Sequence, residues 1–130
     1  MASRLTEIVI DSANPARLAQ FWAEALDYRV TAEEEGDVAI AGPAGSGPDI
    51  LFQKVPESKA VKNRIHFDVN ATDRDQAGEV ERLITLGARR VDIGQGDVGW
   101  VVLEDPEGNE FCVLRRRVAP APEPLVAADI

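Results

Sequence analysis

Apolar residues along this chain recur with two periods, and the longer period predicts two helices. One stripe at helical spacing consists of Leu18, Phe21, Trp22, Ala25 and Leu26. Asn14 followed by Pro15 is a typical helix start before it, with the Asn side chain as N-cap. The second stripe consists of Ala77, Val80, Leu83 and Ile84. We expect its helix to begin near Thr72, where acidic residues favour the positive end of the helix dipole, and to end at Gly87.

Shorter segments alternate between apolar and polar residues or are short apolar runs, and these predict strands. The expected strands are residues 4–11, 28–34, 37–41, 49–55, 64–70, 88–93, 99–104 and 109–116. Turns rich in Gly and Pro separate them. The tail, residues 118–130, is rich in Ala and Pro, and we expect it to be disordered or to lie against a partner.

The order strand, helix, strand, strand, strand occurs twice, in module one (residues 4–55) and module two (residues 64–116). Residues 6–11 of the first module match residues 65–70 of the second. Each half is too small to bury its sheet alone. We therefore expect one α+β domain over residues 1–117, in which two tandem βαβββ modules form a curled mixed sheet around a cavity, with the helices on the outer face.

Composition narrows the possible partners. The 130 residues include 23 Asp and Glu against 14 Lys and Arg, a formal net charge of -9, which argues against a nucleic-acid partner. No apolar run reaches the roughly 18–20 residues that cross a bilayer, so no membrane partner is expected. The single cysteine excludes an internal disulfide. With no signal-peptide pattern at the N-terminus, these features predict a cytoplasmic protein.

The closing segment Asp105-Pro106-Glu107-Gly108-Asn109-Glu110-Phe111, together with the duplicated module, resembles the vicinal oxygen chelate superfamily. Its glyoxalase-like and bleomycin-resistance-like members are the most similar. Residues 99–114 carry the most specific part of the resemblance, and Phe21-Trp22 supports it. The superfamily contains isomerases, dioxygenases, lyases and antibiotic-sequestering proteins, so the resemblance implies a fold and a small-molecule ligand rather than one reaction. It also implies a homodimer.

Strand alternation turns the polar side chains of each module's opening strand toward the helix-free face, which we expect to line the cavity. In metal-dependent members of the superfamily, the first and last strands of each module supply the ligands from this face. By register, these positions fall on Glu7, Leu51, His66 and Cys112. Leu51 cannot bind a metal. Glu7, His66 and Cys112 are left as a three-ligand set for one divalent ion, with Gln53 as a fourth if the register shifts by two residues. No other cofactor is indicated.

The substrate cavity is expected to be lined by Asp11, Leu51, Gln53, Asp68, Trp100 and Leu114. The first hypothesis is a metal-assisted lyase or isomerase acting on a small oxygenated substrate, with Glu7 and His66 as catalytic residues and Glu7 or Asp68 transferring a proton. The alternative is a metal-free protein that sequesters a ligand, as bleomycin-resistance-like members do, with acidic side chains favouring a cationic or hydrogen-bond-donating molecule. A subunit that binds no ligand is the third option.

Each candidate residue also has a purely structural interpretation. His66 can be a hydrogen-bonded strand residue, and Glu7 can be an ordinary ion-paired carboxylate. Cys112 can be a small buried apolar residue, because most unpaired cysteines are buried. Trp100 can pack in the core or in an interface.

Overall fold

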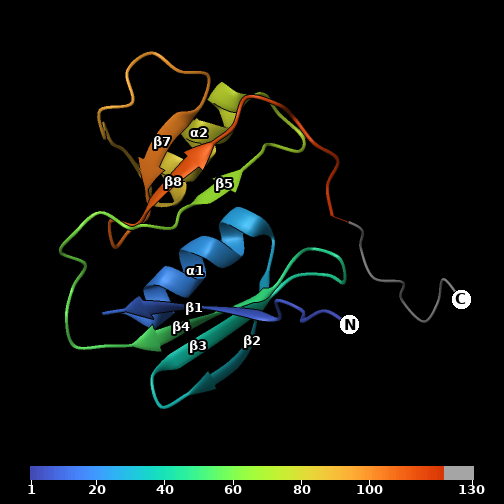
Figure 1. Cartoon of the computed structure of the whole chain (residues 1–130), viewed down its shortest axis with the longest axis vertical. Coiled ribbons are helices and arrows are strands. Elements are labelled where there is room, and N and C mark those ends of the chain that lie inside the picture. The colour runs from blue at the N-terminus through green and yellow to red at the C-terminus, as the bar shows by residue number, and fades with distance from the viewer. Residues whose placement is uncertain (122–130) are drawn as a thin grey trace, which may run out of the picture. The chain divides into compact units, whose positions relative to one another are not determined.

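The computed structural model describes residues 1–121, which form two compact units, Met1–Lys54 and Val55–Pro120 (Figure 1). Each unit contains one helix and one four-stranded mixed sheet in the order β-α-β-β-β. The predicted α+β class with two tandem βαβββ modules is therefore confirmed, and each module has a sheet of its own. Most of the predicted tail lies outside the described residues.

The first module places its helix against one face of its sheet. Its elements are β1 (Glu7–Ser12), α1 (Pro15–Leu26), β2 (Arg29–Glu34), β3 (Asp37–Ala41) and β4 (Asp49–Lys54). The strand order is β1-β4-β3-β2, with β1 parallel to β4 and the other pairs antiparallel. Phe21 and Trp22 of α1 are buried, as the helical stripe predicted, and meet edge to face with ring centroids 5.1 Å apart. The sheet contributes Ile50 and Phe52 to this core.

The start of α1 agrees with the prediction made from Asn14 and Pro15. The Asn14 side chain accepts a hydrogen bond from the backbone N–H of Arg17, and Pro15 occupies the first helical turn. The helix ends at Leu26 because Asp27 adopts the left-handed conformation, with φ of 56°.

The predicted start of the second helix is wrong by about one turn. This helix, α2 (Gln76–Leu86), is capped by Asp75, whose side chain accepts the N–H of Gly78 at 2.8 Å. Thr72 lies in a bend before the helix. The helix begins later because the carboxylate of Asp75 is the one that reaches a free backbone N–H of the first turn. Gly87 ends the helix as expected.

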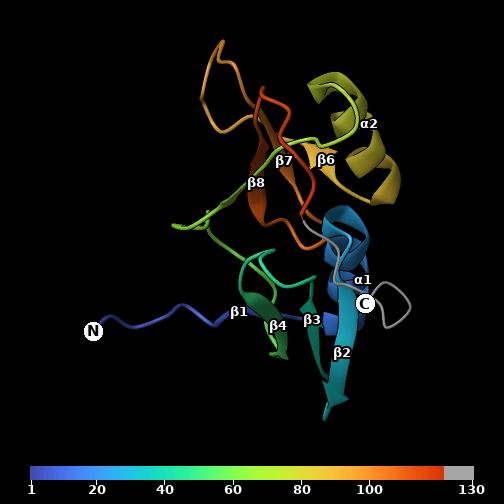
Figure 2. The ribbon, with the colours of Figure 1, turned by 90° about the vertical axis from the view of Figure 1, so that its right-hand side faces the viewer.

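The second module has the same order with shorter strands. Besides α2 it contains β5 (Phe67–Val69), β6 (Arg89–Arg90), β7 (Val101–Glu104) and β8 (Glu110–Val113). The sheet order is β5-β8-β7-β6, with β5 parallel to β8, and α2 lies along one side of it (Figure 2). The core includes Val80 and Leu83 of α2 with Leu103, Phe111 and Val113 of the sheet.

Several predicted strands of the second module were too long. The strand expected over residues 64–70 covers only Phe67–Val69, because only three of its residues pair with β8. The strand expected over residues 88–93 covers only Arg89–Arg90. It is this short because only these two residues pair with β7, opposite Glu104 and Leu103.

The turn between β7 and β8 is built around Asp105, which is fully buried. Its Oδ1 accepts the backbone N–H groups of Glu107 at 2.9 Å and Asn109 at 3.0 Å. The side-chain amide of Asn109 donates to both carboxyl oxygens. Gly108 has a φ of 87°, which favours glycine. This turn fixes where β8 begins, and β8 carries Cys112.

Candidate metal and ligand site

The register of β5 and β8 brings two polar groups together in the second module. Asp68 of β5 lies directly opposite Cys112 of β8, and Val102 of β7 lies opposite Cys112 on its other side. Directly paired residues share one face of a sheet. Phe111 and Val113 alternate to the other face, where they join the core beneath α2. Asp68 and Cys112 therefore lie on the face that α2 does not cover.

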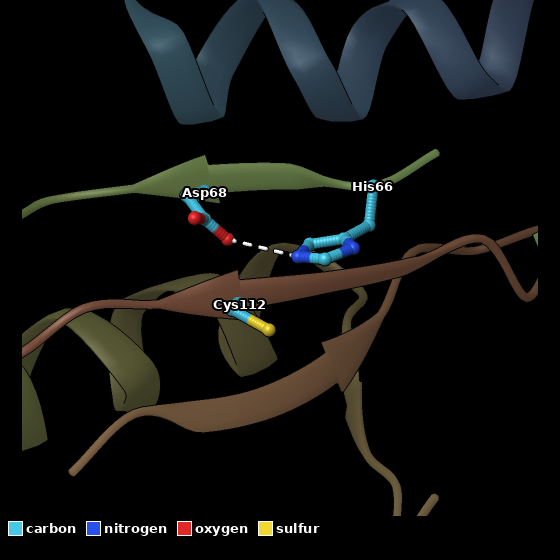
Figure 3. Close-up of side chains that lie close together, drawn as sticks. All are labelled: His66, Asp68 and Cys112. Carbon is cyan, nitrogen blue, oxygen red and sulfur yellow. Dashed lines mark ion pairs between the residues drawn. The ribbon is translucent and has the colours of Figure 1, made fainter. Parts of the chain in front are cut away.

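His66 completes a cluster with these two residues (Figure 3). It immediately precedes β5, and its Nε2 lies 3.1 Å from Oδ1 of Asp68. The potential ligand atoms of His66, Asp68 and Cys112 all lie within 4.8 Å of one another. The His66 and Asp68 side chains are 47% and 50% exposed, whereas Cys112 is buried. The cluster thus has one side open to solvent and a buried thiol on the other.

The surroundings of Cys112 favour its protonated form when no cation is present. Burial raises the pKa of the thiol, and the Asp68 carboxylate raises it further, while the charge of Lys62 partly opposes both. A divalent cation bound between Asp68 and Cys112 acts in the opposite direction, because it stabilises the thiolate. The buried position that the structural interpretation predicted for Cys112 is confirmed and is compatible with a ligand role.

The donor set fits an ion of the zinc class. Zinc takes histidine nitrogen and carboxylate oxygen at about 2.0–2.2 Å and thiolate sulfur at about 2.3 Å, often with three protein ligands in catalytic sites. Such bond lengths at tetrahedral angles place ligand atoms roughly 3.3–3.7 Å apart. The ligand atoms here lie within 4.8 Å of one another, and a bound ion would draw them to that spacing. The soft thiolate fits zinc better than magnesium or calcium.

The structure brings together two of the three predicted ligands. His66 and Cys112 meet as expected, and Asp68, predicted only as a cavity residue and proton carrier, is the third member of the cluster. Glu7 lies exposed at the start of β1 in the other module, and its part in a metal site stays a prediction. The signal for Asp68 was present in the sequence, since it is two residues after His66 and so faces the same way along a strand.

The first module has apolar residues where the second has ligands. Leu51 of β4 lies opposite Val9 of β1 and opposite Ala39 of β3. Glu7 and Asp11 lie two positions to either side of Val9, on the same face of β1. This face therefore combines an apolar row with exposed carboxylates.

The other predicted cavity residues are spread over both modules. Asp11 pairs with Gln53 in the ladder between β1 and β4, and both are exposed. Leu114 follows β8, where its N–H donates to the carbonyl of Val69 at 2.8 Å. Trp100 precedes β7 with its side chain exposed. Contact of these residues with a ligand stays a prediction.

Comparison with known proteins identifies a family. The sequence model of the glyoxalase-like domain matches residues 7–114. Among curated protein sequences, none matches this chain significantly. Within residues 1–121, no helix is both long enough and apolar enough to cross a membrane.

Solved structures with the same fold come from several organisms. The fosfomycin resistance protein FosX from Mesorhizobium loti is 15% identical with a TM-score of 0.66, over 91% of this chain and 95% of that chain. A glyoxalase/bleomycin resistance protein/dioxygenase family enzyme from Burkholderia phytofirmans is 16% identical with a TM-score of 0.64, over 85% and 97%. The trypanothione-dependent glyoxalase I of Leishmania major is 14% identical with a TM-score of 0.61, over 88% and 87%. Identities this low show a shared fold.

Proposed function

This chain belongs to the glyoxalase-like domain family, within the vicinal oxygen chelate superfamily, and we propose that it binds a small oxygenated molecule at a divalent metal ion, as a lyase or isomerase. His66, Asp68 and Cys112 would hold the ion. The observation that supports this most is the convergence of three different metal-binding side chains within 4.8 Å on one sheet face. Exposed carboxylates alone would not support a metal site, but a histidine and a cysteine beside a carboxylate do.

Each of the three side chains would supply one ligand atom to the ion. When bound, a zinc-class ion supplies Lewis acidity to adjacent oxygens of a ligand. His66 would offer a ring nitrogen, Asp68 a carboxylate oxygen, and Cys112 a sulfur from the buried side. His66 and Asp68 are about half exposed, so a ligand would reach the ion from their side.

The proposal also gives different roles to Glu7 and Asp68, the two residues predicted to transfer a proton. If Asp68 binds the ion, its carboxylate is no longer free to act as a base, and Glu7 is left as the candidate for proton transfer. We therefore expect Glu7→Gln to retain zinc affinity and to lose turnover of a substrate once one is found. A loss of zinc affinity in Glu7→Gln would instead assign Glu7 to the ligand set.

Zinc content tests the proposed site without knowledge of the substrate. The full-length protein is dialysed against buffered Zn²⁺ and its metal content is measured by mass spectrometry. We expect one ion per chain in the wild type, and binding weakened about tenfold or more in His66→Ala and in Asp68→Asn. Glu81→Gln is the matched control, because Glu81 is an exposed carboxylate on α2. Equal zinc content in all four proteins, or none in the wild type, would overturn the proposed site.

An open coordination position has its own test. Acetohydroxamate carries oxygens on two neighbouring atoms and serves as a probe for a small oxygenated ligand. We expect it to bind the zinc-loaded wild type in a calorimeter and not to bind the chelator-treated protein. Binding that is unaffected by removal of zinc would show that the metal takes no part in recognition.

The apolar row of the first module supports a second candidate function. Val9, Leu51 and Ala39 form a continuous strip across three strands, with Glu7 and Asp11 beside it. Such a face suits a cationic ligand with an apolar body that is held without a metal. A thermal shift with a cationic aromatic amine such as tryptamine, measured in the presence of a chelator, would favour this function. No shift under these conditions would leave the metal-dependent function favoured.

Two broader expectations belong to the same proposal. We propose a homodimer, as the superfamily resemblance implies, and light scattering in solution should then give twice the mass of one chain. We also propose a cytoplasmic location, because a thiol that ligates a metal must stay reduced.

A further inference from the structure

A buried carboxylate next to the proposed site connects β8 to the chain that leads into His66. Glu110 lies two residues before Cys112, and its side chain is almost fully buried. It forms an ion pair with Lys59, whose Nζ lies 2.7 Å from Oε1. The backbone N–H of Asn63 donates to the same carboxylate at 3.2 Å and 3.4 Å.

A second contact strengthens this connection. The side-chain amide of Asn63 donates to Oδ1 of Asn109 at 2.9 Å. Asn109 is itself held by the buried Asp105 in the turn before β8. Asn63 is therefore fixed to the beginning of β8 through both its backbone and its side chain.

The segments on both sides of His66 are thus attached to the same strand, β8. On the C-terminal side, Phe67 pairs with Phe111 of β8. On the N-terminal side, Asn63 is attached to Glu110 of the same strand. Between these anchors the chain has little packing to hold it, since the Ile65 side chain is 81% exposed. The separation between His66 and Cys112 is consequently set by two attachments to β8.

We propose that Glu110 and Lys59 are positioning residues for His66, an inference that rests on the metal site proposed above. The Glu110 carboxylate does not bind the ion, because it is already paired with Lys59 and accepts the backbone N–H of Asn63. Its function is to hold the segment before β5 so that the imidazole of His66 stays within reach of Cys112. Groups that orient metal ligands typically alter metal affinity about 10–100-fold when they are replaced.

Zinc affinity measured by calorimetry on the full-length protein tests this role. We expect Glu110→Gln and Lys59→Met each to weaken zinc binding about 10–100-fold. The double variant should lose little more, because both changes remove the same ion pair between Lys59 and Glu110. Glu104→Gln is the matched control. Glu104 lies directly opposite Glu110 on β7 but forms an ion pair with Arg89 of β6, away from His66, so its affinity should match the wild type.

Amide hydrogen exchange of the metal-free proteins gives a readout that is independent of zinc. We expect residues 61–66 to exchange faster in Glu110→Gln and Lys59→Met than in Glu104→Gln, with exchange in α2 unchanged in all three. Unchanged α2 exchange shows that the variants are folded. If Glu110→Gln does not fold, Lys59→Met is used alone, because it removes the ion pair and leaves the Glu110 carboxylate to accept from Asn63.

The outcomes separate the two proposals. If the wild type binds zinc and the two variants bind it as tightly as Glu104→Gln does, the positioning role is overturned and the metal site stands. If the wild type binds no zinc, the proposed function fails, and exchange at residues 61–66 decides the positioning role. Unchanged exchange at those residues in both variants overturns it.

Discussion

Asp68 lies directly opposite Cys112 in the parallel ladder of β5 and β8, and the equivalent pair in the first module is Val9 opposite Leu51. The two modules therefore have the same register at this point but different side chains. In the second module the pair offers a carboxylate and a thiol beside His66, and in the first it is apolar. The duplicated frame therefore carries a cluster of potential metal ligands in one module and an apolar face in the other.

This equivalence predicts that the cluster can be transferred to the first module. The counterparts of His66, Asp68 and Cys112 are Glu7, Val9 and Leu51, since residues 7–9 match 66–68 in the repeat. The triple variant Glu7→His, Val9→Asp, Leu51→Cys should bind two zinc ions per chain where the wild type binds one. Metal content and a circular dichroism spectrum check the result. A folded variant that still binds a single ion would contradict the structural equivalence of the two faces.

The fold could be predicted from the sequence because its signals are local and occur twice. The stripe that includes Phe21 and Trp22 marks one helix, and Asn14-Pro15 marks its start. Where the predicted limits of an element were wrong, the observed limits are set by side-chain capping or by strand pairing. Thr72 does not begin α2, because the side chain of Asp75 caps it. The strand at β5 ends where its pairing with β8 ends, and alternation alone does not show that limit.

The candidate site was only partly predictable for a related reason. His66 and Cys112 follow from the repeat and the superfamily resemblance. Asp68 joins them through cross-strand register, which depends on which strands are neighbours. The contact between Glu110 and Asn63 spans 47 residues of sequence, and no local pattern indicates it. Glu7 is assigned by the resemblance, and its role in a shared site stays a prediction.

Tyr28 provides a test of the packing in the first module at high pH. Its hydroxyl donates to the carbonyl of Ser46, and burial raises its pKa, with the Asp49 charge adding to the effect. Tyr28 therefore keeps its proton to higher pH in the folded protein than in the unfolded chain, where a tyrosine titrates at about 10. Stability should be unaffected by this group below that pH and should fall as the pH rises through the folded pKa.

This titration is directly measurable because Tyr28 is the only tyrosine in the sequence. Ultraviolet absorbance of the phenolate should show a midpoint above that of a free tyrosine. Asp49→Asn should lower the midpoint only in part, since burial is the larger cause. In Tyr28→Phe, the alkaline loss of stability due to this group should disappear. A midpoint at the ordinary value would show that the hydroxyl is not buried as described.

The turn before β8 predicts a large difference between two aspartates. Asp105 is fully buried and accepts several N–H groups, so Asp105→Ala leaves buried donors unsatisfied. We expect a loss of about 2–4 kcal/mol in the free energy of unfolding by urea. Asp92 also accepts a turn N–H, from Gly94, but is exposed, and Asp92→Ala should cost under about 1 kcal/mol. Equal losses would contradict the structural role given to the buried turn.

The cobalt spectrum tests the central claim most directly, because it reports which atom binds the metal. Co²⁺ replaces zinc readily in such sites, and a thiolate ligand adds an intense charge-transfer band in the near ultraviolet. We predict that the wild-type protein, titrated with Co²⁺, develops this band up to one ion per chain, and that Cys112→Ser lacks it. A protein that binds no Co²⁺, or a band that is unchanged in Cys112→Ser, would contradict a metal site at His66, Asp68 and Cys112.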